Sequence, residues 1–160
     1  MTKYFECFEK EMKKVAKEAK AEREERIAEM ENVRNHYIPE IVKTLMHISK
    51  AVTPYISSFD YCDSDLNGMI VTAEKATVAI GNMQMAVKFN KEVTTVEFYD
   101  GCDSITMLSK QIDLLKDISI YLGENLEDIM TSALRQYKNA CSSANVDAKV
   151  QSVYHVAIAM

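Results

Sequence analysis

The sequence has few residues that interrupt helices and strands. Its 160 residues include four Gly and two Pro, and no Trp. This scarcity, together with 48% hydrophobic residues, excludes a disordered chain and indicates a folded core. A chain of this length buries about two thirds of its unfolded surface, so it needs neither disulfides nor a metal in order to fold. We therefore expect one domain that spans residues 1–160.

Signals of export and of membrane insertion are also lacking. The N-terminus becomes charged before an apolar run forms, and no apolar run approaches the length of a membrane span. No C-x-x-C spacing occurs among the four cysteines, Cys7, Cys62, Cys102 and Cys141. They predict neither a zinc site nor a tight disulfide framework. We expect a cytoplasmic protein with reduced thiols and no membrane partner, and two disulfides in an oxidising compartment are the alternative.

Motifs for catalysis are missing as well. The chain contains no G-x-S-x-G, no glycine loop for phosphate and no H-E-x-x-H. Asp113 and Asp117 lie four residues apart and could pair as carboxylates, but the usual explanation of such a pair is a solvated helix face, here beside Lys110 and Lys116. We expect that the protein is not an enzyme and that it uses no cofactor, with calcium as the one possible exception.

The net charge of −5 is concentrated in the middle of the chain. Residues 60–103 hold eight acidic side chains and three lysines, whereas residues 1–35 hold nine of each sign. Because no basic stripe exists, we expect no direct contact with nucleic acid. An acidic surface instead attracts a basic partner. The predicted partner-binding residues are Asp60, Asp63, Asp65, Asp100 and Asp103.

The first 35 residues predict a long charged helix. Its apolar residues step by three and four, which is helical spacing: Phe5, Phe8, Met12, Val15 and Ala19. Glu and Lys four residues apart add a few tenths of a kcal/mol per pair. Two interpretations remain open. The helix could project as a coiled-coil arm for self-association, or it could lie on its own domain.

The next elements are predicted from proline, glycine and alternation. A second helix is expected from Pro39 to Val52, with a Pro54-kinked extension as an alternative. Residues 69–99 alternate and are rich in Val, Thr, Phe and Tyr, which predicts an antiparallel meander of three or four strands. Gly81-Asn82 supplies a hairpin turn.

The last third of the chain predicts two further helices. Ser104 could cap a helix that ends near Gly123, and Asn125 could open another that ends near Cys141. Residues 146–160 alternate as a closing strand would, and a helix is the alternative. The predicted fold class is therefore α+β: two N-terminal helices, the first long and coiled-coil-like, a small antiparallel β-meander, two further helices and a closing strand.

One segment has a defined chemical pattern. Asp63 to Glu74 fits D-x-[DN]-x-[DN]-G-x5-E, with Gly68 at the turn and an aliphatic Ile70. It resembles the calcium loop of the EF-hand family. The resemblance implies that one calcium ion would be held by Asp63, Asp65, Asn67, the Met69 carbonyl and Glu74. A polar turn between a helix and a strand explains the same residues, and the sequence leaves both interpretations open.

The favoured hypothesis is a non-enzymatic protein-binding or inhibitory module. It would act through its acidic surface and its long N-terminal helix, and it would be a homo-oligomer. The alternative is a calcium-binding regulatory module that uses the Asp63 to Glu74 loop.

Overall fold

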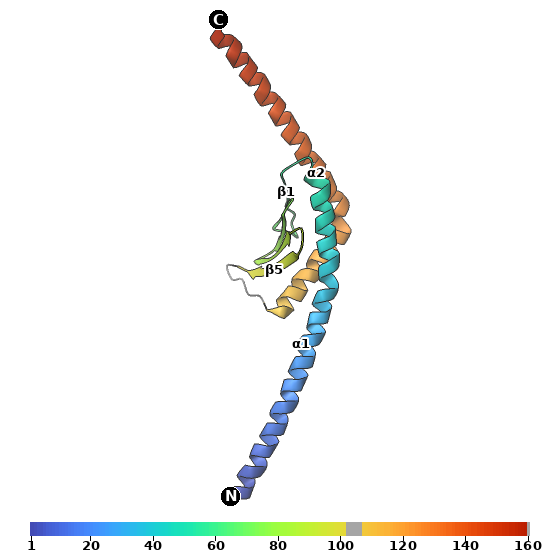
Figure 1. The fold of residues 1–160 in the computed structure, drawn as a ribbon, viewed down its shortest axis with the longest axis vertical. Coiled ribbons are helices and arrows are strands. Elements are labelled where there is room, and N and C mark those ends of the chain that lie inside the picture. Colours follow the sequence, from blue (N-terminus) through green and yellow to red (C-terminus); the bar gives the residue numbers. More distant parts are fainter. Residues whose placement is uncertain (102–106, 160) are drawn as a thin grey trace.

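The protein consists of two long helices and one antiparallel sheet (Figure 1). A computed structural model describes residues 1–101 and 107–159, with side chains described as far as residue 143. The elements in chain order are α1 (Thr2–Val52), β1 (Ser58–Tyr61), β2 (Gly68–Thr72), β3 (Lys75–Ile80), β4 (Met83–Phe89), β5 (Thr94–Asp100) and α2 (Leu108–Ala159). The strands follow one another across the sheet in the order β1-β2-β3-β4-β5.

The sheet buries one face because its residues alternate. In β2, Met69 and Val71 are buried while Ile70 between them is exposed. The same alternation buries Ala76 and Val78 in β3 and Phe59 and Tyr61 in β1. The two-residue turn between β3 and β4 is possible because Gly81 takes a positive φ of 59°. The meander predicted over 69–99 is therefore present with four strands, β2 to β5, and β1 adds a fifth strand before it that was not predicted.

The two helices cover the buried face of the sheet and contact each other. The C-terminal part of α1 and the first half of α2 supply the helical part of the core: Ile41, Leu45, Ile48, Val52, Leu114, Leu115, Ile118, Tyr121, Leu122, Ile129 and Ala133. Buried Ser49 donates a hydrogen bond of 2.7 Å to the carbonyl of Thr72, which ties α1 to the end of β2. The α1 helix is thus fixed to the rest of the molecule by its second half.

The helices run in the same direction but are displaced along their axes. Arg34 donates to the Gln111 side chain near the start of α2, Thr44 lies beside Leu122, and Val52 lies beside Ala133. Residue numbers therefore rise together along both helices. Because α2 begins beside the middle of α1 and passes its end, α1 projects at one end of the molecule and α2 at the other (Figure 1).

Helix α2 covers the outer edge of the sheet that β1 forms. The side-chain oxygen of Gln136 accepts a 3.2 Å hydrogen bond from the backbone N–H of Asp60, and its amide donates to the Asp60 carbonyl. A glutamine side chain thus takes the place of a neighbouring strand. This contact limits pairing of the β1 edge with another chain.

The prediction of two separate N-terminal helices was wrong. Instead, α1 runs unbroken through Pro39 to Val52. A proline inside a helix costs about 3 kcal/mol. Full burial of a single large aliphatic side chain contributes about 1.5–3 kcal/mol, and Ile41, Leu45 and Ile48 are all buried on the far side of the proline. Burial therefore outweighs the local preference to end the helix.

The predictions for the last third of the chain were also wrong. One helix, α2, replaces the two predicted helices, and the expected boundary survives only as a kink at Asn125 (φ −119°, ψ 15°). The predicted strand over 146–160 is also wrong, since α2 continues to Ala159. The kinked helical extension after Pro54 is absent as well, because Ser58–Tyr61 form β1. The predicted cap at Ser104 lies outside the described residues.

Candidate functional site

The twelve residues of the EF-hand-like segment are divided between a turn and a strand. Asp63, Asp65 and Asn67 lie in the connection between β1 and β2, whereas Met69 belongs to β2 and is fully buried. Glu74 lies in the turn after β2. The five residues of β2 separate the two groups by about 17 Å of extended strand.

The polar side chains of this segment have partners of their own. The Asp63 carboxylate accepts hydrogen bonds from the Ser64 hydroxyl (2.8 Å), the Tyr61 hydroxyl (3.3 Å) and the backbone N–H of Asp65 (3.4 Å). The bond from Ser64 is the main cause that lowers the pKa of Asp63. Asn67 donates to the Gly81 carbonyl at 2.7 Å. The turn is therefore organised by local hydrogen bonds.

The structure thus brings Asp63 and Asp65 together and places Glu74 at the opposite end of β2. Within the described part of the chain, no group of three or more His, Cys, Asp or Glu side chains is arranged to hold a metal ion. Calcium binding by this segment stays a prediction. In this arrangement it would have to use the turn and not the whole twelve-residue loop.

The acidic residues gather at one end of the sheet. The turn with Asp63 and Asp65 follows β1, and Asp100 is the last residue of β5. Antiparallel pairing across the sheet places the C-terminal ends of β1 and β5 at the same end of the strands. Asp60 lies on the adjoining edge strand, and Asp103 lies outside the described residues. We call this region the acidic end.

The sequence did not show that α2 adds to the acidic end. Asp65 lies in a groove of about 310 Å³ with Asp117 and Glu124. A second groove of about 280 Å³ joins Asp100 with Asp113 and Asp117 of α2. Lys110 offsets part of the charge by a 2.7 Å ion pair with Asp100. The helical spacing of Asp113 and Asp117 was visible in the sequence, but their position beside the strand ends was not.

A buried tyrosine lies behind the acidic turn. Tyr121 is 5% exposed, and its ring lies 6.1 Å from that of Tyr61. Its hydroxyl has no hydrogen-bond partner among the described residues. Burial, with smaller contributions from Tyr61 and Asp63, raises the pKa of Tyr121 above its ordinary value of 10.0. The structure therefore holds this hydroxyl in its neutral form.

The first part of α1 carries an uncovered apolar stripe. We call residues 2–20 the arm, and every residue of the arm is exposed. Its large apolar side chains are more than half exposed: Tyr4 (74%), Phe5 (58%), Phe8 (56%), Met12 (53%) and Val15 (54%). The arm projects from the rest of the molecule (Figure 1).

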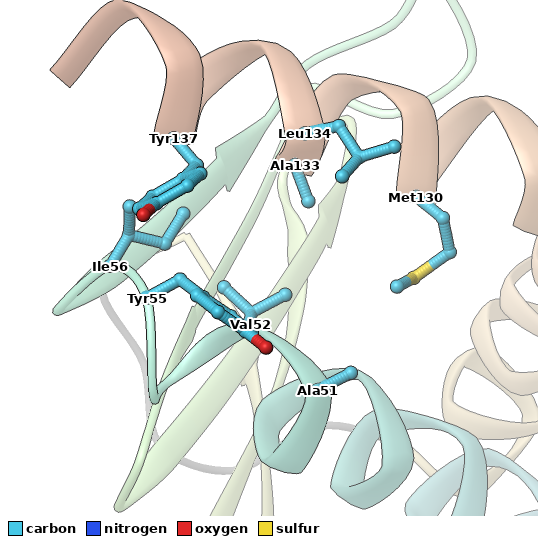
Figure 2. Close-up of a pocket in the computed structure, with 8 residues that line it drawn as sticks. All are labelled: Ala51, Val52, Tyr55, Ile56, Met130, Ala133, Leu134 and Tyr137. Atoms are coloured by element: carbon cyan, nitrogen blue, oxygen red, sulfur yellow. The ribbon is translucent and has the colours of Figure 1, made fainter. Parts of the chain in front are cut away.

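An apolar groove that sequence reasoning missed lies where α1 ends. It has a volume of about 310 Å³, and we call it the tyrosine groove; its lining residues are Ala51, Val52, Tyr55, Ile56, Met130, Ala133, Leu134 and Tyr137. Figure 2 shows α2 along one side and the end of α1 with the following turn along the other. The rings of Tyr55 and Tyr137 meet edge to face at 5.3 Å. The sequence signal for this groove is the apolar pair Tyr55-Ile56 after Pro54, which in the sequence also fits a kinked helical extension.

Neither α1 nor α2 has the unbroken apolar length that a bilayer crossing needs, over the residues that the structure describes. Cys7, Cys62 and Cys141 are free thiols on the surface.

Replacement of Tyr121 by Phe tests the buried hydroxyl. The unfolded chain loses the tyrosine proton near pH 10 whereas the folded state retains it, so stability that is complete below pH 10 falls as the pH rises above that value. The loss is up to about 1.4 kcal/mol per pH unit. We expect Tyr121→Phe to stabilise the protein by about 1 kcal/mol at pH 7, because it removes a buried hydroxyl that has no hydrogen-bond partner, and to weaken the loss above pH 10.

Urea unfolding at pH 7 and pH 10.5 provides the measurement, with the exposed Tyr4→Phe as the matched control. An equal loss of stability at pH 10.5 in wild type and Tyr121→Phe would contradict this account of the buried hydroxyl.

Calorimetric titration of calcium into wild type and Glu74→Gln tests the arrangement of the EF-hand-like segment. We expect the substitution to leave any heat of calcium binding unchanged, because β2 holds Glu74 away from Asp63 and Asp65. An Asp63→Asn variant is the matched control within the turn. Loss of binding heat in Glu74→Gln would show instead that the twelve residues enclose one ion.

The sequence resembles the EF-hand family in one loop only, and the structure presents three surfaces that are available for contacts. They are the arm, the acidic end and the tyrosine groove. No family model, no curated protein and no solved structure matches this chain.

Proposed function

We propose that the chain is a non-enzymatic protein-binding module whose main contact is the arm, and that it associates with itself. The observation that carries this proposal is the uncovered stripe of Phe5, Phe8, Met12 and Val15. Single exposed apolar side chains are ordinary on protein surfaces. A continuous stripe at helical spacing is instead typical of a surface that meets another helix.

The energetics of the arm favour a partner. Each of these side chains is more than half exposed, and its burial would contribute about 1 kcal/mol or more. Every residue of the arm is exposed, and most helical stability in proteins comes from the packing of an apolar face, so contacts with a partner would also stabilise the helix itself. Within the arm the stripe is flanked by six lysines and four glutamates, so side chains of both signs are available to form ion pairs with a partner.

The acidic end supports a second contact, with a basic surface of another protein. Asp60, Asp63, Asp65 and Asp100 are joined there by the carboxylates of α2. Such a concentration of one sign of charge speeds the approach of a basic partner and orients it. In an inhibitory role the module would cover the basic surface that it binds. The exposed free thiols fit a cytoplasmic setting in which cysteines stay reduced.

Substitution of Phe8 by Glu tests the role of the arm. Phe8 lies in the middle of the stripe, and a charge there must be desolvated on association. We expect wild type to have a mass above the 18.2 kDa of one chain, as measured by sedimentation equilibrium over a range of concentrations. Phe8→Glu should sediment as a single chain, with a dissociation constant raised at least about tenfold.

The matched control is Ala21→Glu, which adds the same charge on the opposite side of α1. It should leave the mass unchanged. A wild-type protein that stays at 18.2 kDa at high concentration, or an equal effect of both substitutions, would contradict self-association through the stripe.

A further inference from the structure

The tyrosine groove continues the contact between α1 and α2. Along that contact, Thr44 lies beside Leu122 and Val52 lies beside Ala133. Beyond Val52 helix α1 ends, and the chain turns into β1 while it stays beside α2 through Tyr55 and Asp60; α2 itself continues as a helix to Ala159 (Figure 1). The groove is thus the place where α2 extends past the end of its neighbouring helix.

The groove presents apolar side chains that nothing in the described chain covers. Leu134 is 71% exposed and Tyr55 is 64% exposed, although both border the buried Val52 and Ala133. Figure 2 shows Leu134 and Ala133 on the α2 side and Val52 with Tyr55 on the opposite side. All eight lining residues are apolar or tyrosine. A groove of this composition fits the apolar face of a helix.

The stripe of the arm lies on the same face of α1 that packs against α2 within the chain. Phe5 is 36 residues before Ile41, and Met12 is 36 residues before Ile48. At 3.6 residues per turn these separations are about ten full turns, so each pair points in nearly the same direction from the helix axis. Ile41 and Ile48 are each 2% exposed in the core, whereas Phe5 and Met12 are uncovered.

We infer that the arm of one copy docks in the tyrosine groove of a second copy, beside the end of the second copy's α1 and in the same direction as its α2. The inference rests on the proposed function and names the surface that the arm binds. In the docked state, Phe5, Phe8 and Met12 would face α2 of the second copy. Ile41 and Ile48 face α2 in the same way within one chain. The contact between parallel helices would thereby continue from one molecule to the next.

Docking within one chain is excluded by distance. Phe8 and Val52 lie on the same unbroken helix, and 44 residues at 1.5 Å each place them about 66 Å apart. The contact is therefore heterologous, because an arm on one copy meets a groove on another. Such contacts build rings or open filaments and not closed two-fold dimers.

Mixing two variants distinguishes this arrangement from pairing of arm with arm. Phe8→Glu removes the stripe and keeps the groove, whereas Leu134→Glu puts a charge in the groove and keeps the arm. Each variant alone should sediment as one chain, with its dissociation constant raised at least tenfold. An equimolar mixture should form a complex of twice the mass of one chain, because one intact arm and one intact groove remain.

Several controls keep the result interpretable. Leu134 is exposed, so its substitution should leave the circular dichroism spectrum and the thermal midpoint unchanged. Tyr55→Glu, on the opposite side of the groove, should act as Leu134→Glu does and provides a second groove variant. Ile120→Glu places the same charge at an exposed α2 residue outside the groove and should leave association unchanged.

Three outcomes would overturn the inference. If Phe8→Glu dissociates the protein but Leu134→Glu and Tyr55→Glu do not, the arm binds elsewhere, and the proposed function stands without this docking site. If every variant behaves as one chain and the mixture does not combine, the contact is not between arm and groove. If wild type itself remains a single chain, both the docking site and self-association are wrong.

Discussion

The structure depends on the burial of one face of α1 against α2 and the sheet. Ile41, Leu45 and Ile48 lie in that contact, and Ser49 adds a hydrogen bond to the end of β2. The burial is strong enough to carry the helix through Pro39. It also fixes the axial displacement of the two helices, so that α1 projects at one end and α2 at the other (Figure 1). The arm and the tyrosine groove are both consequences of that displacement.

Local patterns in the sequence predicted the elements whose stability is local or periodic. The stripe from Phe5 to Ala19 identified the long first helix, and alternation over 69–99 identified the sheet. The interpretation of Pro39 and Gly123 as helix ends was wrong, because these residues indicate only the local free-energy cost of a helix. The burial of apolar side chains on either side outweighs that cost. Over 146–160 the sequence fits two periods, and the backbone follows the helical one. The groove could not be predicted, since Tyr55 and Tyr137 are 82 residues apart in the chain.

The EF-hand-like segment shows that one sequence pattern can be compatible with two different structures. Its pattern of Asp, Asn and Gly also suits a tight turn, and Gly68 to Thr72 pair with strands on both sides. That pairing holds Asp63 and Glu74 at opposite ends of β2. The acidic end was predicted in part from Asp60, Asp63, Asp65 and Asp100. Its remaining carboxylates come from α2, which only the three-dimensional arrangement places beside them.

The central claim is that the arm is a binding surface and not a solvated helix. Hydrogen–deuterium exchange of the backbone amides of residues 2–20, measured over a range of protein concentrations, tests it most directly. A lone exposed helix opens readily and exchanges fast, whereas a docked one is protected. We expect slow exchange in the arm that becomes slower as the protein concentration rises. Fast exchange that does not change with concentration would contradict it.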